Sequence, residues 1–258
     1  MLTLLSRELG PQEEPRGVGT VKENPELTFW KQWLHGTWPW LGGFDSCQKA
    51  ISCDANIMVS SRRCEVTEFY PDGGWPNAYL SHVSERTCMD VGCGMDGMVP
   101  FWRHAGRRIL VDPLVDEYTK AIDEYMEVNA KLGVNWLKGN ELRACSATDQ
   151  SMDDVIGMVD GTIVFRNALD HDSGSHAALL SKVLSFSAEG SLLLFWSEFT
   201  HASSDPGHHD CDLSPEMAKQ AIIDAGFEIL SRTIPVHGPG YVQGLDFGCV
   251  AMKRRNHG

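Results

Sequence analysis

The segment Asp90-Val91-Gly92-Cys93-Gly94-Met95-Asp96-Gly97 (DVGCGMDG) decides the fold of this chain. It follows Thr87–Val91, a short apolar run that predicts a buried strand, and it precedes Met98–His104, which can start a helix. Glycines between a strand and a helix let the backbone turn tightly and approach a ligand without a Cβ in the way. The segment therefore predicts a ligand-binding turn in an α/β sheet.

Predicted strands and helices alternate along the rest of the chain. The later strands are expected at Arg108–Val111, Glu141–Ser146, Gly161–Phe165, Ser191–Trp196, Glu228–Val236 and Leu245–Lys253. The helices between them are expected at Asp116–Leu132, Ser175–Phe186 and Ser214–Ala225. This alternation predicts an α/β fold, a doubly wound, mostly parallel seven-stranded sheet with helices on both faces. Such sheets bind ligands at the carboxyl ends of their strands.

The N-terminal third of the chain differs in composition from the rest. Residues 1–26 carry Gly, Pro and Glu without a period and predict a flexible leader. Residues 27–83 hold five of the eight tryptophans, and Leu27–Leu34 has apolar residues at helical spacing. We expect residues 27–83 to form a partly helical cap that packs on a main domain at 84–255. A role as a substrate lid is compatible with this packing.

The overall composition limits the class of function. The chain has 258 residues, 42% of them hydrophobic, and a formal net charge of −13. Such an excess of acids argues against nucleic acid as a partner, because Lys and Arg supply most of the affinity for phosphates. Apolar runs are shorter than the roughly 18–20 residues of a membrane helix, and a secretory pattern is missing. We expect a cytoplasmic protein without a membrane partner.

The eight cysteines give no sign of a metal site by their spacing. None of them form a CxxC pair, and the irregularly spaced Cys47, Cys53 and Cys64 have no histidine among them. Reduced thiols of a cytosolic protein fit this distribution best.

An acid follows the second predicted strand, as a nucleoside-binding site requires. Asp112 lies about twenty residues beyond the glycine turn, where a carboxylate can accept both hydroxyls of an adenosine ribose. The turn also matches GxGxxG at Gly92, Gly94 and Gly97, so a NAD-binding Rossmann oxidoreductase is an alternative. Asp90 argues against it, because a carboxylate repels a pyrophosphate and attracts the ammonium of an amino acid.

Several segments taken together resemble the class I S-adenosylmethionine-dependent methyltransferases. The resemblance covers roughly residues 84–255 and rests on DVGCGMDG (90–97), ILVDP (109–113), VDGTIVFRNALDH (159–171), SAEGSLLLF (187–195) and SPEMAKQAIIDAGFEIL (214–230). It implies a Rossmann-like fold, S-adenosyl-L-methionine as the cofactor and methyl transfer as the activity. The DPLVDEY and NALDH signatures, with the FWKQWL…WPW leader, look like a bacterial subgroup that modifies saccharides or cell surfaces.

The resemblance also implies a set of cofactor-binding residues. The glycine turn would face the methionine part of the cofactor, Asp90 would orient its amino group, and Asp112 would hold the ribose. The full set is Asp90, Gly92, Cys93, Gly94, Asp112, Pro113, Ser146 and Asn167. Two positions depart from the family pattern, because Asp96 replaces a common third glycine and Ser146 stands where an acid often binds adenine. These departures keep a non-catalytic methyltransferase-fold binding protein as a second alternative.

Titratable side chains past the fourth and fifth strands are candidates for the acceptor side. In-line transfer to a hydroxyl of a small molecule or saccharide needs a base, and the predicted catalytic residues are His171, Asp170 and His208. Glu198 and His201 follow the fifth strand and are further candidates. The acceptor and the oligomeric state stay open.

The segment His208-His209-Asp210-Cys211-Asp212 also offers metal ligands. Adjacent ligands in a loop seldom all point inward, and neither HxH nor HxxxH spacing occurs there. A solvated loop that touches substrate fits better, so no metal is expected.

Overall fold

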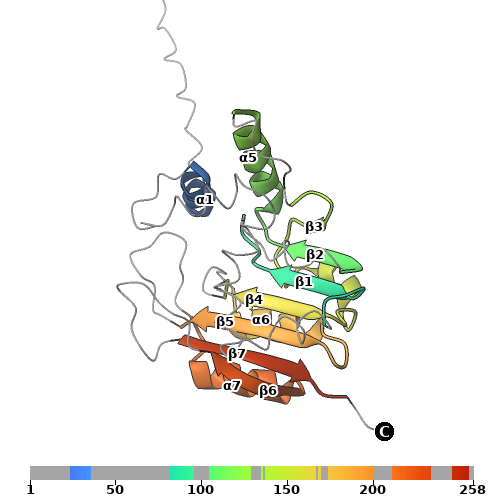
Figure 1. The fold of residues 1–258 in the computed structure, drawn as a ribbon. Helices are drawn as coiled ribbons and strands as arrows, with labels where there is room; N and C mark the ends of the chain where they lie inside the picture. Colours follow the sequence, from blue (N-terminus) through green and yellow to red (C-terminus); the bar gives the residue numbers. More distant parts are fainter. Residues whose placement is uncertain are drawn as a thin grey trace, which may run out of the picture.

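The computed structural model describes residues 24–35, 82–95, 105–128, 135, 137–166, 168–169, 174–199, 211–233 and 246–255. Seven strands form one sheet in these ranges (Figure 1). They are β1 (Thr87–Val91), β2 (Arg107–Val111), β3 (Glu141–Arg143), β4 (Thr162–Arg166), β5 (Leu192–Glu198), β6 (Phe227–Thr233) and β7 (Asp246–Lys253). The described helices are α1 (Pro25–His35), α5 (Val115–Val128), α6 (His176–Ser185), α7 (Pro215–Asp224) and the 3-10 helix η2 (Gln150–Val155).

The strand order is β3-β2-β1-β4-β5-β7-β6. The strands from β3 to β5 run parallel, whereas β7 is antiparallel to both β5 and β6. The predicted α/β class and the mostly parallel seven-stranded sheet are confirmed. The carboxyl ends of β1, β2, β3 and β4 are neighbours, so the turns that follow these strands meet at one edge of the sheet.

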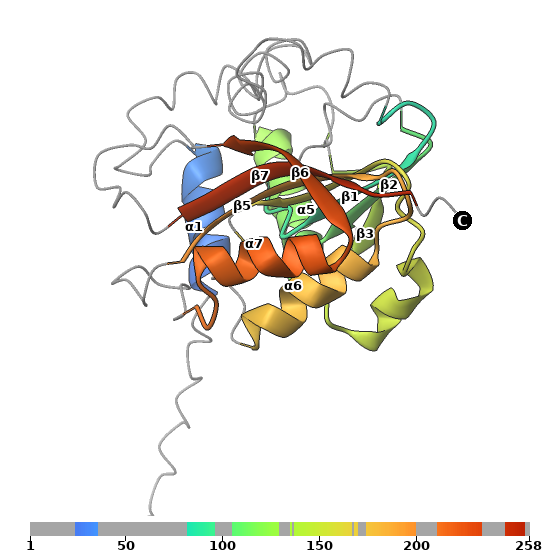
Figure 2. The same cartoon turned by 90° about the horizontal axis from the view of Figure 1, so that it is seen from below.

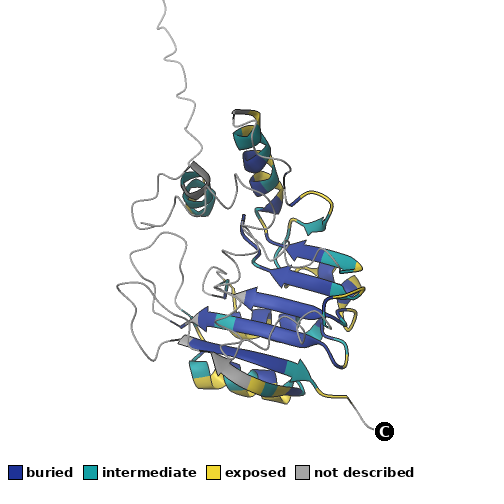
Figure 3. Ribbon diagram, in the orientation of Figure 1, coloured by how far each residue is buried: buried dark blue, intermediate teal, exposed yellow. Residues whose placement is uncertain are grey.

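Alternating strand residues build two separate cores, one on each face of the sheet. On one face, Met89 and Val91 of β1 join a cluster with residues of η2, α6 and α7. On the other face, Cys88 of β1 joins a cluster with residues of α5, and Trp30 of α1 packs against it. Figure 2 shows α6 and α7 together on the same face of the sheet. In Figure 3 the central strands are almost entirely buried, as expected for a sheet covered on both faces.

Serine caps begin two of the helices at the predicted positions. The side chain of Ser175 accepts a hydrogen bond from the N–H of Ala178. The side chain of Ser214, which directly precedes Pro215, accepts one from the N–H of Met217. The helix α7 is followed by Gly226 with φ of 85°, a left-handed conformation that favours glycine.

Some elements differ from the sequence-based expectation. Strand β3 ends at Arg143 and not at Ser146, because the chain turns toward η2, whose N-cap Asp149 accepts from Ser151. The 3-10 helix η2 has no counterpart among the elements predicted from the sequence. Among the described residues, α5 ends at Val128, and the helix expected at Met98–His104 lies outside them. None of the described helices is both long and apolar enough to cross a membrane.

Of the predicted N-terminal cap, the structure describes α1, which begins at Pro25, and residues 82–83. The α1 residues Leu27 and Trp30 pack against the core beside α5, as the helical spacing of their apolar side chains predicts. Residues 36–81, with Cys47, Cys53 and Cys64, lie outside the described residues, and the domain bounds stay a prediction. The five cysteines that the structure describes form no disulfide.

Candidate cofactor site

The glycine turn after β1 takes the tight left-handed conformation that its sequence predicts. Gly92 and Gly94 have φ of 65° and 56°, a region in which side chains with a Cβ are strained. The N–H of Gly92 donates to the carbonyl oxygen of Val111 at 2.8 Å, which ties the turn to the end of β2. The buried Cys93 lies between the two glycines, and its N–H faces the same carbonyl at 3.4 Å. This backbone shape leaves the peptide groups of the turn at the edge of the sheet.

The carboxylate of Asp112 organises the two loops that meet at this edge. Its Oδ2 accepts the N–H of Gly94 at 3.1 Å, and its Oδ1 accepts the N–H of Leu114 at 2.9 Å. The side chain thus joins the glycine turn after β1 to the start of α5 after β2. A carboxylate has about four acceptor sites, so two remain beyond these backbone bonds.

Burial and a neighbouring acid change the protonation of Asp112. Only 5% of the residue is exposed. Burial is the main cause that raises the pKa of Asp112 to about 7, and the charge of Glu26 raises the pKa further, while the N–H of Leu114 opposes both. Glu26 lies on α1, far away in the sequence. At neutral pH this carboxyl group therefore stands near the midpoint of its titration.

The helix α1 covers the glycine turn. A methyl group added to Gly94 would lie 2.5 Å from Cζ2 of Trp30, so the missing Cβ lets the indole reach the turn. The indole also meets the ring of Tyr118 edge-on, with 6.1 Å between centroids. The hydroxyl of Tyr118 donates to Glu26 at 3.0 Å. Burial is the main cause that raises the pKa of Tyr118, so this hydroxyl keeps its proton and stays a donor.

Residues that precede the turn and follow β4 complete the described surroundings. Asp90, in β1 itself, is 4% exposed. A methyl group added to Gly92 would lie 2.1 Å from the Cβ of Ala168, just past β4. Only glycine at position 92 therefore lets the turn pack against the end of β4.

The other predicted cofactor residues lie along the same edge of the sheet. Pro113 is exposed and directly follows Asp112, and Ser146 lies past the end of β3, half-buried, with its hydroxyl 3.0 Å from that of Thr148. The structure thus gathers most of the predicted cofactor set after three adjacent strands. Asn167 and the predicted catalytic residues Asp170, His171 and His208 lie outside the described residues.

Three residues next to the turn were not predicted as site residues. Glu26, Trp30 and Tyr118 reach it from α1 and α5. Their signal in the sequence was weak, because Glu26 lay in the expected leader and Tyr118 belonged to the apolar stripe of a helix.

The fold resembles those of solved methyltransferases, although the sequence matches no known family. No protein-family model and no curated protein matches the chain in sequence. The N-methyltransferase NodS from Bradyrhizobium japonicum WM9, solved with S-adenosyl-L-homocysteine, superposes with a TM-score of 0.50 at 14% identity, over 90% of this chain and 99% of that one. An O-methyltransferase family protein from Burkholderia thailandensis gives a TM-score of 0.49 at 12% identity, over 90% and 72% of the two chains. The CurJ carbon methyltransferase gives 0.49 at 13% identity, over 90% and 67%.

At such low identities the superposition with NodS establishes the architecture alone. The chain has the Rossmann-like fold of the class I S-adenosylmethionine-dependent methyltransferases.

Proposed function

We propose that this protein binds S-adenosyl-L-methionine at the glycine turn and transfers its methyl group to an acceptor. The observation that carries the proposal is the bridge from Asp112 to Gly94, at the edge of a sheet with the order β3-β2-β1-β4-β5-β7-β6. A carboxylate that follows the second strand and lies beside a glycine turn can accept hydrogen bonds from the two hydroxyls of an adenosine ribose. The chemistry that the cofactor supplies is a methyl group on a sulfonium, which leaves a neutral thioether behind.

The described residues fit the cofactor part by part. The two acceptor sites of Asp112 that these backbone N–H groups leave unused suit the ribose hydroxyls. Asp90, buried in β1, suits the ammonium group of the methionine, through its charge. Ser146 and the exposed Pro113 lie on the side where adenine would follow the ribose.

The alternative of a nicotinamide dinucleotide fits less well. Open dinucleotide-binding sheets have the order 3-2-1-4-5-6 with parallel strands. Here the antiparallel β7 lies between β5 and β6. In addition, Asp90 is buried immediately before the turn, where a pyrophosphate would meet its negative charge.

The acceptor proposed is a hydroxyl of a small molecule or saccharide. It rests on the histidines and acids that follow β4 and β5, with His171 as the base, supported by Asp170, and His208 as a substrate contact. A base within hydrogen-bond reach of a hydroxyl contributes about 10²–10⁴-fold to the rate. The net charge of −13 argues against a nucleic-acid acceptor.

Calorimetric titration with S-adenosylhomocysteine tests the cofactor part of the proposal. We expect saturable binding of one molecule per chain, and Asp112→Ala should weaken it by roughly 1–3 kcal/mol, because a charged hydrogen-bond partner is lost. The control is Asp116→Ala, which removes an exposed acid four residues further along the same segment. Binding that is absent, or equal in both variants, contradicts the proposal.

Turnover tests the acceptor part separately. Release of S-adenosylhomocysteine is followed with saccharides, small hydroxylated molecules and RNA as acceptors. We expect His171→Ala to lower turnover more than cofactor affinity. Cofactor binding without turnover on any acceptor would favour the non-catalytic alternative.

A further inference from the structure

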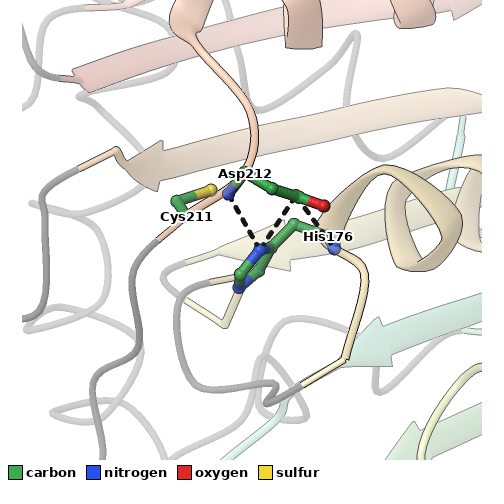
Figure 4. A group of neighbouring side chains, drawn as sticks. All are labelled: His176, Cys211 and Asp212. Carbon is green, nitrogen blue, oxygen red and sulfur yellow. Dashed lines mark hydrogen bonds and ion pairs between the residues drawn. The ribbon is translucent and has the colours of Figure 1, made fainter.

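Three residue types that bind metal ions meet at the start of α6. His176 is the first residue of α6, and Cys211 and Asp212 lie in the segment that leads into α7 (Figure 4). One potential ligand atom from each lies within 4.8 Å of the other two. The helices α6 and α7 follow β4 and β5, so the cluster lies on the carboxyl side of the sheet.

The hydrogen bonds of the His176 ring cannot all be satisfied by one proton. Its Nδ1 lies 3.0 Å from Oδ1 of Asp212 and 3.1 Å from the backbone N of the same residue. A protonated Nδ1 would donate to the carboxylate but face the N–H. An unprotonated Nδ1 would accept from the N–H but set its lone pair against that of the carboxylate oxygen. A cation bound to the Nδ1 lone pair and to the carboxylate would remove this repulsion, and the N–H of Asp212 would then release Nδ1.

The other ring nitrogen is also incompletely bonded. His176 is 3% exposed, and its buried Nε2 has no hydrogen-bond partner within the described residues. Buried polar atoms are nearly always paired, so each exception calls for an explanation. Packing alone explains neither this unpaired nitrogen nor the conflict at Nδ1.

The carboxylate of Asp212 is held in place as metal-binding carboxylates are. Its Oδ1 accepts the backbone N–H of His176 at 3.1 Å, and its Oδ2 accepts the hydroxyl of Ser175 at 3.3 Å. Such outer hydrogen bonds orient ligands and are part of most metal sites. The first turn of α6 thus positions the carboxylate before any ion arrives.

We propose that His176, Cys211 and Asp212 form a binding site for one divalent cation of the zinc type. A nitrogen, a thiolate sulfur and a carboxylate oxygen are ligands that Zn²⁺ combines. On binding, the Cys211 thiol releases its proton to solvent, and the two anionic ligands balance the charge of the ion. Three protein ligands leave the fourth tetrahedral position for water or an oxygen of a substrate.

This inference departs from the expectation that the chain binds no metal. In this part of the chain, that expectation rested on the spacing of the neighbouring residues from His208 to Asp212 alone. It missed His176, which comes from another helix. The site does not depend on the proposed methyl transfer, so its test is carried out without cofactor.

The test is a titration of the full-length chain, stripped by a chelator, with Co²⁺ and then with Zn²⁺. We expect a thiolate-to-cobalt absorption band that saturates at one ion per chain and disappears when Zn²⁺ displaces Co²⁺. Cys211→Ser should abolish the band, and Asp212→Asn should weaken binding by at least about tenfold. Cys145→Ser is the matched control, because Cys145 is another half-buried thiol, outside the cluster, and its loss should leave the titration unchanged.

Cys211 is only partly buried and Asp212 is exposed, and circular dichroism checks that the variants fold. An absent band in the unaltered chain, or a band that survives Cys211→Ser, overturns the proposal. A melting temperature that ignores Zn²⁺ but falls with Asp212→Asn also overturns it, since the cluster would then be only a hydrogen-bonded link between α6 and the segment before α7.

Discussion

Glu26, at the start of α1, accepts a hydrogen bond of 3.0 Å from the hydroxyl of Tyr118, 92 residues away on α5. The bond fixes the N-terminal helix beside the loop that carries Asp112. The charge of Glu26 also raises the pKa of that aspartic acid. One contact between distant segments thus links the position of α1 to the electrostatics of the proposed ribose site.

Removal of the Tyr118 hydroxyl should loosen α1. Tyr118→Phe keeps the buried ring but loses a hydrogen bond to a carboxylate, which costs about 1.5–3 kcal/mol. We expect faster amide hydrogen exchange in residues 25–35 with little change in the sheet. Glu26→Gln is the comparison, because an amide oxygen still accepts from the phenol and the effect should be smaller. Equal exchange in all three proteins would show that the contact does not hold the helix.

A methyl group at Gly94 should displace α1 as well as strain the turn. The left-handed conformation alone costs alanine about 1–2 kcal/mol, and the added Cβ would lie 2.5 Å from Trp30. Gly139→Ala is the matched control, because Gly139 has φ of 82° and no atom within 4 Å of the added Cβ. Urea unfolding should show a larger loss for Gly94→Ala than for the control. In a chain that already carries Trp30→Ala, Gly94→Ala should lower the free energy of unfolding no more than Gly139→Ala does. A larger loss in that chain would rule out the steric clash with the indole.

Cofactor affinity should increase with pH up to about 7. Ribose hydroxyls donate to Asp112, so binding favours its ionised form, whose pKa in the free protein is about 7. The dissociation constant of S-adenosylhomocysteine should fall by up to tenfold per pH unit between pH 5.5 and 7 and then level off. Glu26→Gln should move the midpoint to lower pH, since the Glu26 charge raises this pKa. A flat profile by calorimetry would mean that Asp112 does not titrate on binding.

The same carboxyl group should make the free protein less stable as the pH rises. Its pKa is raised from 3.8 to about 7 on folding. The contribution of the Asp112 carboxyl group to the free energy of unfolding is therefore fully present below pH 3.8 and is lost as the pH rises through 7. The loss amounts to about 4 kcal/mol at 1.36 kcal/mol per pKa unit. Asp112→Asn should flatten this part of the profile of unfolding free energy against pH, and an unchanged slope would contradict the assignment.

The sequence alone determined the sheet and its glycine turn, because local patterns encode both. Apolar runs such as Leu192–Leu194 predict buried strands, the N-cap Ser214 marks the start of α7, and Gly92 and Gly94 require a backbone that other residues avoid. Asp112 was predicted as the ribose ligand from its place after the second strand. Strand ends such as that of β3 were less predictable, because hydrogen bonds from the following turn decide them.

Only the tertiary structure decided which distant residues meet. The contact of Trp30 with Gly94, the pairing of Glu26 with Tyr118, and the approach of His176 to Asp212 all join segments whose spacing in the sequence has no period. Their energies depend on burial and on distances that arise when the helices pack on the sheet. The raised pKa of Asp112 also depends on the tertiary structure. Its main cause is desolvation by the parts of the chain that bury the carboxyl group, and not the residues next to it in sequence.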